Sequence, residues 1–197
     1  MKLLREYIKK VLLEGAKGVD DLPSNTHIKI WKLSHDVNIQ FTDATGDQFA
    51  DDIIHGLIVI RHVDKALGNC GGAMVVGWAS TKSGWGPLLY DIAIEYATLN
   101  ANGLTADREA VSSDALRVWD YYLNNRSDVK ATQLDNEQGE LTPDDKSDDC
   151  MQVNISTLDK KSKDNWINSS ISKRYTKSPT TINALQKANK LIEGPNQ

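Results

Sequence analysis

The stretch from residue 73 to residue 125 constrains the fold of this chain more than any other. It contains an apolar strand candidate, a glycine turn, a helix, a short strand candidate and a second helix. The apolar run at residues 73–79 predicts the first strand. Pro87 follows the turn and stands where a helix can begin, because the first helical residues need no N–H donor. Two strands joined through such a helix should run parallel in one sheet, connected by a right-handed crossover.

The spacing of apolar residues predicts both helices. In the first helix they recur along one broad face, and Asn102-Gly103 ends it. Residues 104–107 form the short strand candidate, and Ser112 can cap the second helix. Asp91 and Glu95 lie one turn apart on the first helix, and we interpret them as part of a solvated face. The apolar faces are Leu88, Leu89, Ile92, Ala93, Tyr96 and Ala97, then Ala115, Val118, Trp119, Tyr122 and Leu123.

The rest of the chain predicts further strands, most of them antiparallel to their neighbours. Residues 28–33, 37–41 and 57–60 are strand candidates that precede residue 73, and residues 129–134 and 151–155 are strand candidates that follow the second helix. Residues 135–149 are acidic and turn-rich, which indicates a mobile surface loop, and residues 181–192 predict a last helix. We therefore expect an α/β (α+β) fold with a mixed, mostly antiparallel sheet flanked by helices.

Two units follow from this pattern. Residues 1–25 form an amphipathic helix and a linker, and residues 26–197 form one domain with the acidic loop and a C-terminal extension. The net charge of −4 gives no strong attraction for nucleic acid. No apolar run approaches the roughly 20 residues that span a bilayer, and we do not expect the charged N-terminus to be a secretory signal. We expect a soluble cytoplasmic protein with neither nucleic acid nor a membrane as partner.

The two cysteines, Cys70 and Cys150, suit a reducing compartment and argue against a scaffold built on disulfides. Cys70 is interpreted as buried or incidental. The four histidines show no metal-ligand spacing with the cysteines, so no metal site is expected.

The glycine turn has a chemical use as well as a structural one. The first N–H groups of a helix lack internal partners, and the helix dipole adds partial positive charge there. Gly84 and Gly86 would let an anion such as a phosphate approach closely, and Lys82 could add a full charge. The alternative is that this turn is only a tight connection between a strand and a helix.

The order of elements over residues 27–135 resembles the GNAT acyl-CoA N-acyltransferase fold. That order is four antiparallel strands, a glycine turn, a helix, a parallel strand and a second helix. In the family the turn carries Arg or Gln, two residues, Gly, one residue, then Gly or Ala. Gly84 and Gly86 match the glycines, whereas Thr81 stands at the Arg or Gln position with Lys82 beside it.

The resemblance implies acetyl-CoA as the cofactor and N-acetyl transfer to an amine of a small molecule or a protein. It further implies that backbone N–H groups around Trp85, Gly86 and Leu88 hold the pyrophosphate. The strand end at Ala79 and Ser80 would pair with the pantetheine arm.

Candidate catalytic residues come from the second helix and the short strand. The general-acid tyrosine of the family would fall on Trp119, which cannot deliver a proton. Tyr122 continues the apolar face and is predicted to be a core residue, so Tyr121 is the candidate acid. Asp107 and Arg108 follow a strand end, where ligand sites of open sheets gather. Asp107 is the second catalytic candidate, and a structural pair with Arg108 is the alternative.

A second resemblance suggests a different class of function. The runs Gly-Trp-Gly-Pro-Leu-Leu-Tyr-Asp and Arg-Val-Trp-Asp-Tyr-Tyr-Leu-Asn-Asn-Arg-Ser-Asp-Val look like an uncharacterised group of phage-encoded proteins. Residues 12–16, Leu-Leu-Glu-Gly-Ala, resemble the site cut by prohead proteases of T4-type phages. The alternative is an ordinary amphipathic helix stopped by Gly15. This resemblance implies a catalytically silent virion or capsid-associated protein, in the host cytoplasm or the virion, with capsid proteins as partners.

Overall fold

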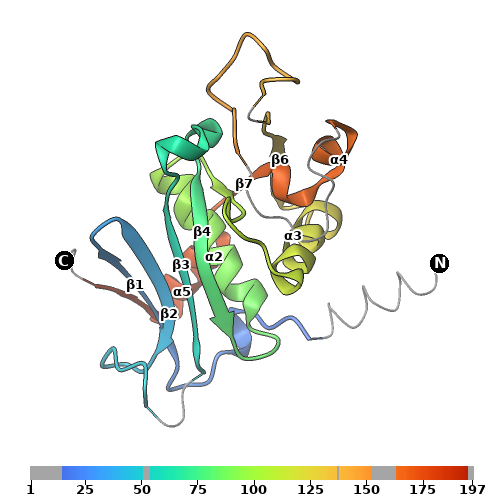
Figure 1. Cartoon of the computed structure of the whole chain (residues 1–197). Helices are drawn as coiled ribbons and strands as arrows, with labels where there is room; N and C mark the ends of the chain where they lie inside the picture. The colour runs from blue at the N-terminus through green and yellow to red at the C-terminus, as the bar shows by residue number, and fades with distance from the viewer. Residues whose placement is uncertain (1–14, 51–53, 137, 152–162, 195–197) are drawn as a thin grey trace, which may run out of the picture.

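The chain forms a mixed eight-stranded sheet with helices packed on it (Figure 1). The computed structural model describes residues 15–50, 54–136, 138–151 and 163–194. The strand order is β6-β7-β5-β4-β3-β2-β1-β8, and within the described residues only the β4–β5 and β1–β8 pairs are parallel. The predicted fold class, an α+β fold with a mixed and mostly antiparallel sheet, is confirmed.

The strands are β1 (His27–Leu33), β2 (Asp36–Thr42), β3 (Gly56–His62), β4 (Met74–Thr81), β5 (Leu104–Thr105), β6 (Val129–Gln133), β7 (Lys173–Lys177) and β8 (Leu191–Glu193). The α-helices are α2 (Gly86–Asn100), α3 (Ser113–Asn125), α4 (Lys163–Asn168) and α5 (Thr180–Lys187). Short 3₁₀ helices are η1 (Val19–Asp21), η2 (Lys65–Leu67), η3 (Cys70–Gly72) and η4 (Ser170–Ser172).

Alternating apolar residues build the face of the sheet that α2 covers. Ile30, Ile39 and Ile58 stand side by side in the register of β1, β2 and β3, and all three are buried. α2 contacts β2, β3, β4, β5 and β7 across this face (Figure 1). Because a helix on a sheet must bury its apolar side against the apolar face of the strands, α2 fixes the core.

The predicted parallel strand pair is present but very short. Met74 pairs with Leu104 and Val75 with Thr105, and β5 then ends. Residues 106 and 107, expected to extend β5, leave the sheet. Beyond Val75, β4 therefore has no strand partner on that side among the described residues.

The C-terminal part departs from the sequence prediction. The last helix ends at Lys187 rather than at residue 192, because Asn189 adopts a left-handed backbone (φ 53°) and redirects the chain. Leu191–Glu193 then form β8 beside β1. β7 was not predicted, since its sequence Lys-Arg-Tyr-Thr-Lys is polar, yet it lies between β5 and β6 with Tyr175 fully buried.

Two expectations about side chains were wrong. Glu95 is fully buried rather than solvated, and it pairs with Lys177 of β7, while Asp91 pairs with Arg126. Cys70 is buried as predicted but is not incidental, because it forms a disulfide with Cys150. Because the two cysteines lie 80 residues apart, their spacing did not indicate that they would meet.

The disulfide anchors the acidic loop. Residues 142–147 of this loop are exposed, as expected of a surface loop, and isolated bridges join Gly68 to Cys150 and Asp135 to Asp149. The predicted N-terminal helix lies outside the described residues. So does most of the predicted strand at residues 151–155. None of the described helices is both long enough and apolar enough to cross a membrane.

Candidate functional site

A cavity of about 580 Å³ follows β4 along the side that β5 leaves unpaired. One wall is β4 from Val76 to Thr81, and the opposite wall is the segment from Asp107 to Trp119 that leads into α3. Gly86, the first residue of α2, also lines the cavity. The cavity therefore joins an unpaired strand edge to a helix N-terminus.

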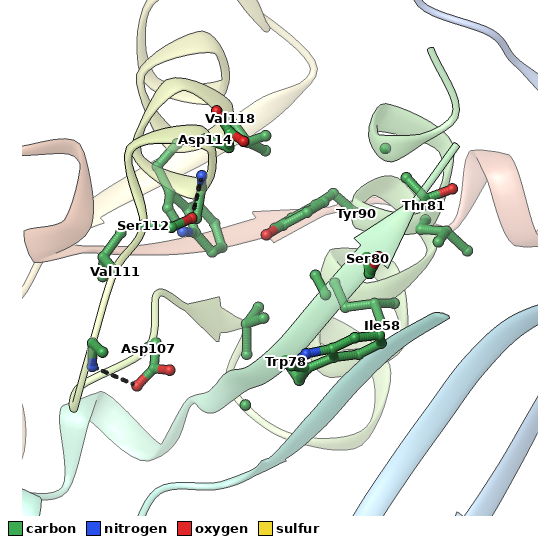
Figure 2. Close-up of a pocket in the computed structure, with 18 residues that line it drawn as sticks. Ile58, Trp78, Ser80, Thr81, Tyr90, Asp107, Val111, Ser112, Asp114 and Val118 are labelled. Carbon is green, nitrogen blue, oxygen red and sulfur yellow. Dashed lines mark hydrogen bonds between the residues drawn. The ribbon is translucent and has the colours of Figure 1, made fainter. Parts of the chain in front are cut away.

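Two local interactions hold the cavity open. The Asp107 carboxylate accepts the N–H groups of Glu109 and Ala110, at 2.7 and 3.2 Å, which turns the chain away from β4 directly after β5. The Ser112 hydroxyl then accepts the N–H of Ala115 at 3.1 Å and starts α3, as its sequence predicted. Figure 2 shows the Asp107–Ala110 and Ser112–Ala115 hydrogen bonds on the wall that faces β4.

β4 carries an irregularity beside the cavity. Its register with β3 shifts between Val59 and Ile60, so Gly77 stands opposite no residue of β3. A bulge of this kind re-aims the following side chains and is common next to binding sites. Trp78, Ala79 and Ser80 follow it and are exposed, Trp78 by 53%.

The glycine turn leads into α2 with unused donors. Gly84 has a positive φ of 84°, which favours glycine, whereas Gly86 has an ordinary backbone conformation. A Cβ on Gly86 would meet only Thr81 Cγ2, at 3.7 Å. The N–H groups of Gly86 and Leu88 have no hydrogen-bond partner among the described residues, and the Trp85 side chain does not cap the helix. They are therefore available to an anion.

Tyr90 is a cavity residue that the sequence did not single out. Its ring reaches from α2 toward α3, edge-on to Trp119 at 5.5 Å between centroids (Figure 2). Burial, together with the Asp107 charge, raises the pKa of Tyr90 to about 12. The hydroxyl therefore stays neutral well above neutral pH and can act as a hydrogen-bond donor. Its position one turn after Gly86 was the signal that could have found it, since both residues then share a face of α2.

The structure brings only some of the predicted site residues to this cavity. Ala79, Ser80, Gly86 and Asp107 line it. The side chains of Trp85 and Leu88 are buried, with Trp85 edge-to-face with Phe41 at 5.6 Å. The Trp85 N–H donates to the Lys82 carbonyl oxygen at 3.2 Å, and Leu88 lines a smaller cavity elsewhere. Lys82 is exposed and borders a neighbouring cavity, and Gly84 lies in the turn itself.

The two predicted catalytic residues lie in different places. Tyr121 lines a smaller cavity of about 310 Å³ between α2, α3 and α5, away from Asp107. Tyr122 is buried, as predicted, and its hydroxyl donates to Asp91 at 2.7 Å. Burial and the Asp91 carboxylate hold the pKa of Tyr122 well above its usual value.

One group of carboxylates has the spacing of a metal site. Oxygens of Asp135, Asp148 and Asp149 lie within 4.8 Å of one another. The buried Asp135 carboxylate already accepts the N–H groups of Leu141 and Thr142. These hydrogen bonds close the acidic loop, and we assign the cluster a structural role.

The chain was compared with protein-family models, with curated proteins and with solved structures. Nothing in any of the three matches it. Its function is therefore inferred from the chemistry of the cavity. An unpaired strand edge offers alternating N–H and C=O groups to an extended ligand that carries amides. A helix N-terminus at the end of that edge favours a ligand with an anionic group beyond its amides.

Proposed function

We propose that this chain is a GNAT-like protein that binds acetyl-CoA in the cavity beside β4 and transfers the acetyl group to an amine. One observation carries the proposal: the unpaired edge of β4 leads directly to the N-terminus of α2. CoA has the matching order of groups, with amides along its pantetheine arm and a pyrophosphate beyond them.

The backbone would make most of the contacts. The β4 edge at Ala79 and Ser80 pairs with the amides of the arm, and the N–H group of Gly86 at the start of α2 faces the pyrophosphate. Lys82 is exposed beside the turn and supplies the positive charge that Thr81 lacks. This arrangement supports the expectation from the family resemblance without a matching Arg or Gln.

Transfer needs two proton movements. The acceptor amine loses a proton to the Asp107 carboxylate and attacks the thioester carbonyl, so a C–N bond forms as the C–S bond breaks. The CoA thiolate that leaves then takes a proton. Tyr90 is better placed than Tyr121 to donate that proton, because Tyr90 lines the cavity and Tyr121 does not.

Isothermal titration of the full chain with acetyl-CoA and with CoA tests this proposal. Gly86→Val should weaken binding at least tenfold, because the added side chain enters the cavity at the phosphate end. The variant should still fold, since the new Cβ meets only Thr81 Cγ2 at 3.7 Å. Gly18→Val, outside this cavity, is the matched control. Equal binding by the parent and Gly86→Val would place any site elsewhere.

A catalytically silent virion or capsid-associated protein is the second candidate. Trp119, at the position of the family's general acid, is buried and stacked on Tyr175 at 5.0 Å. It serves the core and has no proton to transfer to a thiolate. Measured release of CoA with a panel of amines separates the candidates, because the silent protein would release none.

A further inference from the structure

A groove of about 530 Å³ adjoins the cavity beside β4 at the end of that strand. Trp78, Ser80 and Thr81 line both the groove and the cavity. The groove also takes in Gln48 and Phe49, which belong to the segment between β2 and β3. A ligand that fills the cavity beside β4 therefore has the groove within reach at Thr81.

Two exposed aromatic side chains line this groove. Phe49 is 75% exposed and Trp78 is 53% exposed, and no other phenylalanine or tryptophan among the described residues is exposed. The Phe49 backbone is held in place, since its N–H donates to the Asp47 carboxylate at 2.8 Å. Burying such rings against an apolar surface is favourable, and the face of an aromatic ring stacks on any nucleic-acid base. The two rings therefore favour a ligand that carries a flat ring.

The charge of the groove complements an anion. Lys82 is exposed and lines the groove together with His55, and none of the described residues that line it is acidic. The Lys82 N–H donates to the His55 carbonyl oxygen at 3.1 Å, so the backbone that carries this ammonium group is fixed beside the start of β3. An ammonium group binds phosphate through a charge-assisted hydrogen bond.

The combination of rings and cation selects one class of ligand. An acyl chain would bury the rings but leave Lys82 unused, whereas inorganic phosphate would pair with Lys82 but leave the rings in water. A nucleotide satisfies both, because it carries a flat base and a phosphate. The amide of Gln48, which also lines the groove, can donate to and accept from the edge of a base.

We infer that the groove binds a nucleotide, with the base against Phe49 and Trp78 and a phosphate at Lys82. The occupant is the nucleotide end of the acetyl-CoA whose arm lies beside β4, because the groove and the cavity share Ser80 and Thr81. This choice of occupant rests on the proposed function, but binding of the nucleotide by itself does not.

Calorimetry of the full chain with adenosine 3′,5′-bisphosphate, the nucleotide end of CoA without its arm, tests the inference. The bisphosphate should bind more tightly than either adenosine or inorganic phosphate. Phe49→Ala should weaken its binding about fivefold or more, the lower end for loss of one aromatic–base stack. Lys82→Gln should also weaken it, because the cation is lost. Both residues line the groove and not the cavity beside β4.

Two exposed residues outside the groove provide matched controls. Leu33→Ala removes an exposed apolar side chain and Lys65→Gln an exposed cation, and both variants should bind the bisphosphate as the parent does. Failure of the bisphosphate to bind the parent would overturn the inference. So would parental affinity in both Phe49→Ala and Lys82→Gln.

Titration with acetyl-CoA separates this inference from the proposed function. If both hold, Phe49→Ala and Gly86→Val should each weaken acetyl-CoA binding, and only Phe49→Ala should weaken binding of the bisphosphate. Acetyl-CoA that binds no more tightly than the bisphosphate, and equally to Gly86→Val, would remove the transferase site and support the groove as a nucleotide site. Gly86-dependent binding of acetyl-CoA that neither Phe49→Ala nor Lys82→Gln weakens would overturn the groove and leave the proposed function standing.

Discussion

Glu95 illustrates at the residue scale what local sequence spacing misses. Its carboxylate pairs with Lys177, 82 residues away, and accepts the N–H groups of Thr181 and Ile182 at the start of α5. Glu95→Gln should lower the free energy of unfolding by about 3–5 kcal/mol, because it leaves a buried ammonium without its main partner. Urea denaturation measures this loss, with Asp114→Asn at an exposed ion pair as the control. A loss in Glu95→Gln no larger than in the control would contradict this role.

Tyr90 gives a pH-dependent prediction at the same scale. Its pKa rises from 10.0 to about 12 in the folded protein, mainly through burial. The raised pKa means that the neutral hydroxyl adds to the free energy of unfolding. This contribution is fully present below pH 10 and is lost as the pH rises through 12. Between pH 9 and pH 12 the parent should lose about 2 kcal/mol more than Tyr90→Phe, at about 1.4 kcal/mol per unit. Urea denaturation at both pH values measures this difference. Identical losses would show that the Tyr90 hydroxyl is not buried as described.

At the element scale, the sequence predicted those strands and helices whose own residues decide their structure. The alternation in β1 to β3, the apolar run of β4 and the capping signals of α2 and α3 are local, and all these elements formed. β7 depends instead on pairing with β5 and β6, which lie far away in the sequence, so its polar residues gave no signal. To predict the cavity, one would have to know where β5 ends. That point is set by the Asp107 turn rather than by apolar pattern.

The Cys70–Cys150 disulfide connects two elements and should contribute measurably to stability. It closes a loop with a sequence separation of 80 residues and joins the acidic loop to η3. Replacing both Cys70 and Cys150 by Ala should lower the free energy of unfolding by about 2–5 kcal/mol. Denaturation with and without reductant measures this loss. Reductant should lower the parent to the level of the variant and leave the variant unchanged. A parent insensitive to reductant, with a variant of equal stability, would show that the disulfide contributes nothing.

At the scale of the whole molecule, the sheet consists of two halves with very few residue pairs between them. Among the described residues, the half made of β8 and β1–β4 pairs with the half made of β5–β7 only at Met74–Leu104 and Val75–Thr105, while α2 contacts strands of both halves. A ligand between the halves should therefore stabilise the entire fold. Acetyl-CoA at a hundred times its Kd should add about 2.7 kcal/mol and raise the Tm by roughly 5–10 °C. Thermal unfolding with and without acetyl-CoA measures the shift, which should vanish in Gly86→Val. A Gly86→Val shift as large as that of the parent would argue against binding at the α2 N-terminus.

Backbone amide NMR of the labelled full chain, titrated with acetyl-CoA, tests the central claim most directly. The unpaired β4 edge and the start of α2 should respond together, so the amides of Ala79, Ser80 and Gly86 should shift in one saturable transition. The amides around Tyr121, in the separate cavity, should remain unchanged. Saturating acetyl-CoA that leaves the β4 and α2 amides unmoved, or that shifts only the residues around Tyr121, would contradict an acyl-CoA site beside β4.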